Sequence, residues 1–226
     1  MMMTTTIKRI VQVLILIFVP LSVFSQEKDF GMWYGGNGEI PIINKLDVEL
    51  SAVVRTFNNA SKIEQAYIEG GANYKFNKFL SIAGSYRLTE NLENNSEYHV
   101  RNKWFADAKI SLPLNSLVLS ARFRFEVQTR SYIVSTKDLI PDYHGRLKLK
   151  ALYKIPKFPV NPYLSYESFS PMYVNSDRFI DKERFTLGFE YKISKKQAIE
   201  AEYIYQRDFV SDIQIISINY FFSFFK

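Results

Sequence analysis

The stretch Arg-Phe-Thr-Leu-Gly-Phe-Glu-Tyr-Lys-Ile, residues 184–193, alternates strictly between two kinds of side chain. Its odd-numbered positions are all apolar or aromatic, and its even-numbered positions are charged, polar or glycine. Successive side chains of a β-strand point to opposite faces of a sheet. The pattern therefore predicts a strand with one apolar face and one ionic face.

The same alternation recurs along most of the chain. Its clearest copies are at 46–55, 117–130 and 146–155, and weaker copies lie near 30–40, 65–76, 80–88, 99–112, 162–169, 198–207 and 213–225. Val53 and Leu152 interrupt the pattern as apolar residues at charged-face positions. Because no helical periodicity competes after residue 26, the sequence predicts an all-β protein with eleven candidate strands.

The connections between these segments are expected to alternate in length. Tight turns are predicted at 42–45, 77–78, 113–116, 156–161 and 194–197, and longer polar loops at 57–64, 89–98, 131–142, 170–181 and 208–212. Short periplasmic turns and longer outer loops are typical of antiparallel transmembrane β-barrels, which usually have an even number of strands. We expect ten to twelve strands and slightly favour twelve, because Gly35–Gly38 could form a turn that divides 30–43.

Residues 1–25 are interpreted as a secretory signal peptide. Lys8 and Arg9 precede an apolar run from Ile10 to Phe24, and Ser25 is a plausible cleavage residue. A membrane-anchoring helix is the alternative, but the run is short for one. We expect cleavage to leave one barrel domain, residues 26–226, in the outer membrane of the cell.

Whether the apolar face of the strands points outward or inward must also be predicted. A soluble exported barrel or sandwich would alternate in the same way, with its charged face outward. Strands of about ten residues and aromatic residues near strand ends favour a membrane barrel. The last strand is strongly aromatic, with Tyr220–Phe225 near its end, which resembles the recognition signal of outer-membrane barrels. Expected partners are therefore outer-membrane lipid, lipopolysaccharide and the barrel-assembly machinery.

The composition excludes several classes of function. The 226 residues carry a formal charge of +6, contain no Cys and contain two His. Disulfides and thiolate metal sites are impossible, and a mild basic excess does not indicate nucleic-acid binding. Gly35-Gly36-Asn37-Gly38 is not followed by a helix or a Lys, so it does not predict a phosphate loop. No cofactor and no metal are expected.

Several short motifs resemble those of one family. They are Trp33-Tyr34 at the start of the first strand, Arg55 at the end of the second, Tyr86-Arg87 after Gly84-Ser85, Arg122 and Arg124 in an Arg-x-Arg strand, Pro162-Tyr163, and the Glu167–Phe169 segment. Together they resemble the domain of unknown function numbered 2490, a family of exported, outer-membrane barrel-like proteins. The resemblance covers nearly the whole mature chain and implies the barrel fold. It brings no catalytic residues.

If the apolar face contacts lipid, the charged residues face the lumen and are unevenly distributed. One arc of the wall carries ten bases against two acids, Asp107 and Glu126; the bases are Arg101, Lys103, Lys109, Arg122, Arg124, Arg130, Arg146, Lys148, Lys150 and Lys154. This basic arc could attract a small anionic solute. Alternatively, these side chains pair with acids and fill a narrow interior.

The sequence thus predicts a non-enzymatic outer-membrane barrel, acting as a narrow channel or as a structural, surface-binding barrel. The alternative is a lipid-modifying hydrolase or acyltransferase of the outer membrane. For that chemistry, His144 would be positioned by Asp142 and would activate Ser131 or Ser135. Trp33 and Trp104 are expected to anchor the barrel at the lipid–water boundary.

Overall fold

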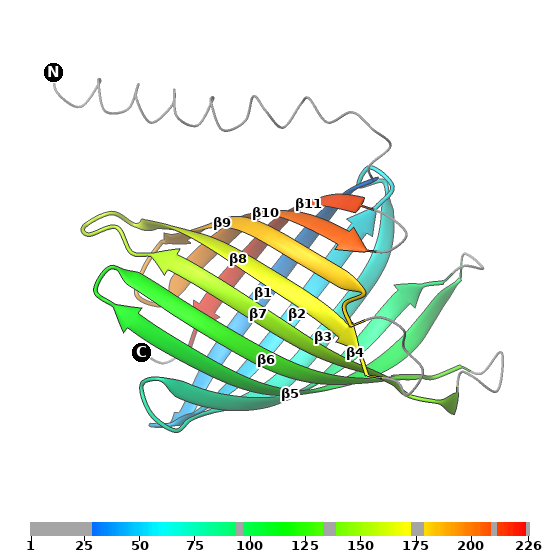
Figure 1. Ribbon diagram of the computed structural model, residues 1–226, viewed down its shortest axis with the longest axis horizontal. Coiled ribbons are helices and arrows are strands. Elements are labelled where there is room, and N and C mark those ends of the chain that lie inside the picture. Colours follow the sequence, from blue (N-terminus) through cyan, green and yellow to red (C-terminus); the bar gives the residue numbers. More distant parts are fainter. Residues whose placement is uncertain (1–28, 94–96, 133–138, 173–178, 209–211, 225–226) are drawn as a thin grey trace, which may run out of the picture.

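The computed structural model is a closed barrel of tilted strands (Figure 1). The structure describes residues 29–93, 97–132, 139–172, 179–208 and 212–224. These ranges contain eleven strands: β1 (Asp29–Ile43), β2 (Leu46–Phe57), β3 (Lys62–Lys75), β4 (Leu80–Leu92), β5 (Tyr98–Leu114), β6 (Leu117–Arg130), β7 (Asp142–Tyr153), β8 (Val160–Pro171), β9 (Lys182–Lys192), β10 (Gln197–Asp208) and β11 (Asp212–Ser223).

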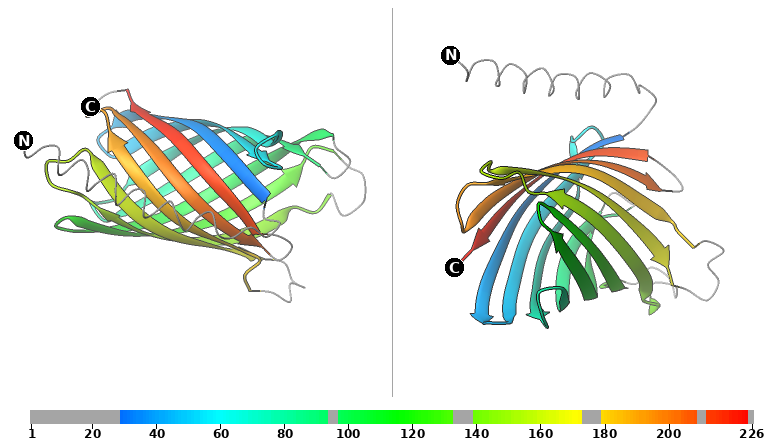
Figure 2. Two further views of the ribbon diagram at one scale, coloured as in Figure 1. Left: turned by 90° about the horizontal axis from the view of Figure 1, so that it is seen from above. Right: turned by 60° about the vertical axis from the view of Figure 1, so that its left-hand side comes forward.

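Consecutive strands pair in antiparallel fashion around the barrel, and β1 closes it against β11. The closing pair is parallel, with a register that runs from Asp29 opposite Ile213 to Glu39 opposite Ser223. The two strands lie side by side in Figure 2. The closing pair is parallel because the number of strands is odd: in up-and-down order, the first and last of eleven strands run in the same direction.

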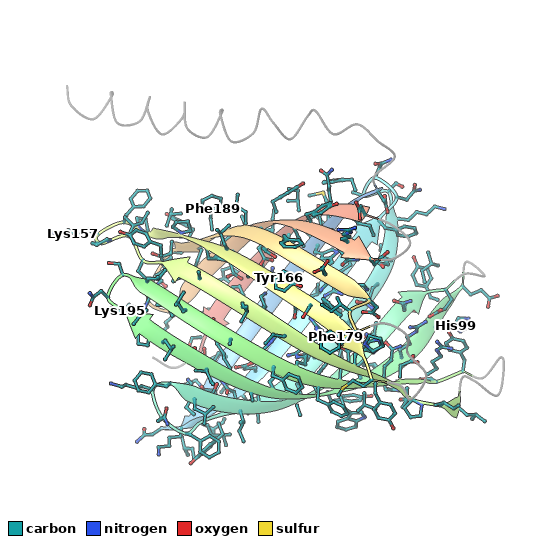
Figure 3. All side chains as sticks on the ribbon, viewed as in Figure 1. His99, Lys157, Tyr166, Phe179, Phe189 and Lys195 are labelled. Carbon is teal, nitrogen blue, oxygen red and sulfur yellow. The ribbon has the colours of Figure 1, made fainter. Side chains whose placement is uncertain are left out.

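The two ends of the barrel differ in their connections. We call one end the turn rim, which carries the connections 44–45, 76–79, 115–116, 154–159 and 193–196. The other end is the loop rim, which carries 58–61, 93–97, 131–141, 172–181 and 209–211. Lys157 and Lys195 mark the turn rim in Figure 3, and His99 and Phe179 mark the loop rim. The connection after β2 is shorter than predicted because Lys62–Glu64 extend β3.

The apolar face of the strands points outward. Phe185 and Phe189 are 46% and 37% exposed, whereas the side chain of Arg184, which directly precedes Phe185, is only 12% exposed. Val53 and Leu152, the two exceptions to the alternation, are buried on the inner side. This orientation matches the predicted membrane barrel and is opposite to that of a soluble sandwich.

The strand number lies within the predicted range of ten to twelve, although eleven strands are found rather than the slightly favoured twelve. The segment that could have been divided, Phe30–Ile43, belongs to one continuous strand, β1. Gly35 is on its inner face, where an added Cβ would lie 2.2 Å from the side-chain oxygen of Asn219 on β11. The glycine therefore allows the closing strands to approach, and it does not form a turn.

Among the described residues, no helix is long and apolar enough to cross a membrane. The predicted signal peptide, residues 1–25, lies outside the described residues.

Candidate functional site

A cluster of ion pairs lies on the inner face of four consecutive strands, β6 to β9. Glu167 on β8 accepts hydrogen bonds from Arg122 on β6 at 2.8 Å and from Arg146 on β7 at 2.9 Å. Arg184 on β9 approaches the other carboxylate oxygen to 3.9 Å. We call these four residues the Glu167 cluster. One carboxylate, only 7% exposed, thus serves three guanidinium groups from three strands.

Further ion pairs extend this cluster along the wall. Arg146 also reaches Glu126 at 3.3 Å, and Glu126 accepts a hydrogen bond from Lys103 at 3.0 Å. Arg124 donates two hydrogen bonds to Asp107, at 2.7 and 2.6 Å, in the bidentate geometry that makes such pairs strong. The ionic side chains of β5 to β9 are therefore held in place by one another.

Another group of contacts joins strands that are not neighbours. Lys150 on β7 donates a hydrogen bond to Glu200 on β10 at 2.9 Å. Its ammonium nitrogen also lies 3.5 Å from the ring centre of Tyr163, whose hydroxyl donates to Glu202 at 2.6 Å. These contacts pass in front of β9, so they fill the interior as well as lining it.

A cavity of about 260 Å³ lies on the loop-rim side of the Glu167 cluster, and we call it the loop-side pocket. Two acids, Glu64 and Glu126, contribute to its wall. They are outnumbered by seven bases, which are Arg55, Arg87, Arg101, Lys103, Arg146, Lys182 and Arg184. The pocket is therefore strongly basic.

Aromatic rings hold several of these bases. The Trp33 ring centre lies 4.1 Å from the guanidinium carbon of Arg55 and 4.9 Å from that of Arg184. The Phe169 ring lies 4.4 Å from the guanidinium carbon of Arg146 and 4.7 Å from that of Arg184. Cations over ring faces are attracted by the ring quadrupole, most strongly by that of Trp. The prediction that Trp33 is a boundary anchor is therefore wrong, because its ring faces the lumen.

A larger cavity, of about 960 Å³, lies on the turn-rim side, and we call it the turn-side cavity. Its wall includes four bases, Arg124, Lys192, Lys195 and Lys196. It also includes six acids, which are Glu39, Glu49, Glu69, Asp107, Glu190 and Glu200. The interior is thus basic towards the loop rim and slightly acidic towards the turn rim.

Seven of the ten residues of the predicted basic arc form ion pairs with acids. Beyond the contacts above, Arg101 pairs with Glu93 at 2.5 Å and Arg130 lies 3.8 Å from Asp142. The full set of paired arc residues is Arg101, Lys103, Arg122, Arg124, Arg130, Arg146 and Lys150.

The remaining three arc residues are placed differently. Within the described ranges, Lys109 and Lys148 have no carboxylate at ion-pair distance. Lys154 lies just beyond the end of β7, on the exposed turn 154–159. The arc is accordingly a mixed, mostly paired surface rather than a row of unpaired cations.

Four bases of the loop-side pocket lie outside the predicted basic arc: Arg55, Arg87, Lys182 and Arg184. They belong to β2, β4 and β9, whereas the residues of the predicted arc belong to β5, β6 and β7 or directly follow β7. Their position along the strands could have indicated that they lie together, because each is nearer the loop-rim end of its strand. Grouping charges by their distance from the rim, as well as by strand, would have brought them together.

The hypothetical catalytic residues do not form the expected arrangement. His144 Nε2 lies 3.7 Å from Asp181, whereas Asp142 accepts a hydrogen bond from Gln128. Ser131 accepts a hydrogen bond from Asn102, and Ser135 lies outside the described residues. No group of three or more potential metal-binding His, Asp or Glu side chains occurs in the part of the chain that the structure describes.

A closed barrel with an apolar exterior and an ionic interior is the fold of outer-membrane β-barrels. The chain superimposes on the crystal structure of the β domain of the Bordetella autotransporter BrkA with a TM-score of 0.50 and 13% identity, covering 79% of this chain and 81% of that one. It is also similar to an anion-selective porin from Comamonas acidovorans, with a TM-score of 0.37, 14% identity and coverage of 75% and 55%. At such identities the likeness to BrkA concerns the fold alone.

Within this class, the sequence matches the family of proteins of unknown function called DUF2490 over residues 30–214. The chain belongs to this family, which confirms the resemblance seen in its motifs. No curated protein matches the sequence.

Proposed function

We propose that this protein is a non-enzymatic outer-membrane barrel that is closed to passive flux and acts as a structural, surface-binding barrel. The observation that carries this proposal is the Glu167 cluster, of which Arg146 and Arg184 line the loop-side pocket and no member lines the turn-side cavity. A continuous water path would have to pass through side chains that are already paired with one another.

Physical chemistry favours a closed interior at this level. Separating Glu167 from Arg122 and Arg146 would leave buried charges without partners, which typically costs about 3–5 kcal/mol when a pair is broken. A solute crossing the barrel would have to offset that cost. The narrow-channel alternative therefore requires these side chains to move.

The placement of the barrel in the cell is part of the proposal. After cleavage near residue 25, the mature chain would be inserted by the barrel-assembly machinery through its aromatic last strand, and its outer face would contact lipid and lipopolysaccharide. Because the longer loops of such barrels usually face outward, the loop rim, with its long connections 131–141 and 172–181, would lie at the cell surface. The loop-side pocket would then face the medium.

We assign no catalytic role. A serine nucleophile needs a base within hydrogen-bond reach that is itself held by a third group. In the described part of this site, His144 has a nearby carboxylate in Asp181, but Ser131 accepts a hydrogen bond from an asparagine.

Single-channel recording in planar bilayers tests the proposal. The refolded wild-type protein should give no conductance steps. A variant with Arg122→Ala and Arg146→Ala removes two large side chains from the Glu167 cluster and should conduct. The Lys154→Ala variant, altered on the exposed turn, should remain silent like the wild type. Regular conductance steps from the wild type would show an open channel and end the closed-barrel proposal.

A further inference from the structure

The loop-side pocket contains more positive charge than its own acids can balance. Two of its cations, Arg55 and Lys182, form no ion pair with any acid in the described ranges. Arg55 instead donates hydrogen bonds to the neutral groups of Gln65 at 3.0 Å and Tyr67 at 3.4 Å. Its Nε is buried and has no hydrogen-bond partner among the residues that the structure describes. Such a group is costly to bury unless another partner satisfies it.

A further cation of the pocket, Arg184, is only weakly neutralised by acidic side chains. Its nearest carboxylate oxygen is 3.9 Å away, on Glu167, which also serves Arg122 and Arg146. Its Nε donates to the neutral side chain of Gln206 at 2.8 Å. The positive charge that no nearby acid neutralises is therefore concentrated at Arg55, Lys182 and Arg184.

Aromatic rings hold these three cations close to one another. Trp33 lies beside both Arg55 and Arg184, as described above, and the Phe169 ring centre is 5.6 Å from the ammonium nitrogen of Lys182. Side chains held in this way lose little freedom when a ligand binds, which favours affinity. The contacts thus give a preorganised, electropositive recess.

We infer that this recess, formed by Arg55, Lys182, Arg184 and Trp33, binds a phosphate-type oxyanion, either free or as a phosphate ester on a small sugar. Cations from strands β2 and β9 approach the same space, so an anion with several acceptor oxygens can satisfy more of them than a carboxylate can. At about 30 Å³ per water, the 260 Å³ pocket has room for roughly nine water molecules. That space suits a small anion rather than a polymer.

The experiment uses the chain's two tryptophans. Trp104 is 58% exposed on the outer face, so Trp104→Phe leaves Trp33 in the pocket as the single tryptophan. This protein, refolded in detergent, is titrated with inorganic phosphate, glucose 6-phosphate and glucuronate at constant ionic strength, which keeps the screening of charge equal. Calorimetry is run in parallel, because substitutions of Arg55 also change the surroundings of Trp33.

Phosphate or glucose 6-phosphate should bind saturably, and glucuronate should bind more weakly. Arg55→Gln and Lys182→Gln should each weaken binding by roughly ten- to a hundredfold, as expected for loss of a hydrogen bond to a charged group. Arg55→Lys should restore part of the affinity. Lys192→Gln, in the turn-side cavity, is the matched control and should bind like the parent. Heat-modifiable gel migration confirms that each variant is folded.

Saturation by phosphate alone, or by the sugar phosphate alone, identifies the source of the anion and supports the inference. Equal or tighter binding of glucuronate, the absence of saturable binding, or unchanged affinity in both Arg55→Gln and Lys182→Gln would overturn it. The inference rests on the proposed function only for the statement that the loop-side pocket faces the medium outside the cell. Absent phosphate binding leaves the closed-barrel proposal intact, whereas wild-type conductance ends that proposal and leaves this site intact.

Discussion

At the scale of single residues, the packing of Tyr163 against Gly188 shows how the barrel interior is filled. Tyr163 is 2% exposed, and its ring lies where a side chain on residue 188 would be, with an added Cβ only 2.2 Å from the ring. Gly188 is its direct partner on the neighbouring strand β9. The missing side chain of one strand thus makes room for the large ring of the next.

Gly188→Ala should therefore destabilise the barrel by about 1–3 kcal/mol, because the ring must move away from Glu202 and Lys150. Gly36→Ala is the matched control, since an added Cβ there meets no atom within 4 Å. Urea unfolding of both variants in lipid vesicles measures the difference. Equal stability of the two would mean that Tyr163 does not occupy this space.

At the scale of the strand, each element has a lipid-facing side whose polarity can be tested. Phe123 lies on the outer face of β6, and Phe179 lies on the loop rim outside the strands. Phe123→Lys should cost about 2–4 kcal/mol if it is near the middle of the bilayer, and Phe179→Lys should cost about 0–1 kcal/mol. Urea midpoints in vesicles would show the difference. Similar midpoints for both variants would show that Phe123 does not face the hydrocarbon core of the bilayer.

The strands are also the level at which the sequence was most informative. Period-two alternation located all eleven strands, including β9 from Arg184–Ile193, because one side of each strand must suit lipid and the other must not. The length of the strands and the aromatic residues near their ends then assigned the charged residues correctly to the inner face. Val53 and Leu152 broke the alternation because the interior is packed with side chains, so apolar residues are stable there as well.

The partners of the inner residues could not be predicted in the same way. Alternation shows that Trp33 and Arg184 share the inner face, but it does not show that β1 and β9 bring them together across the barrel. That contact depends on the strand number, the tilt and the parallel closure. For the same reason the basic arc was read strand by strand, whereas the structure separates charge between the loop rim and the turn rim.

At the scale of the whole molecule, the parallel pairing of β1 with β11 decides the strand number. In the observed register Gly36 is opposite Tyr220, and Tyr34 is opposite Ile218. A twelve-stranded barrel with a divided first strand would not place these residues side by side in parallel. The closing pair therefore distinguishes the structure from the even-numbered arrangement that the sequence slightly favoured.

Paired cysteines can test this closure, because the chain has none of its own. Gly36→Cys with Tyr220→Cys should form a disulfide readily under mild oxidation, since directly opposed residues on paired strands lie about 5 Å apart and a disulfide needs Cα atoms within about 7 Å. Gly36→Cys with Ile218→Cys is the control, because a shift of two residues increases the separation to about 8 Å. Alkylation and mass measurement report the extent of cross-linking in each refolded protein. Because Tyr220 and Ile218 are similarly exposed on the outer face, at 41% and 43%, a difference between the two pairs reports the register. Preferential cross-linking of the control, or none in either protein, would show that the first and last strands do not meet as a parallel pair.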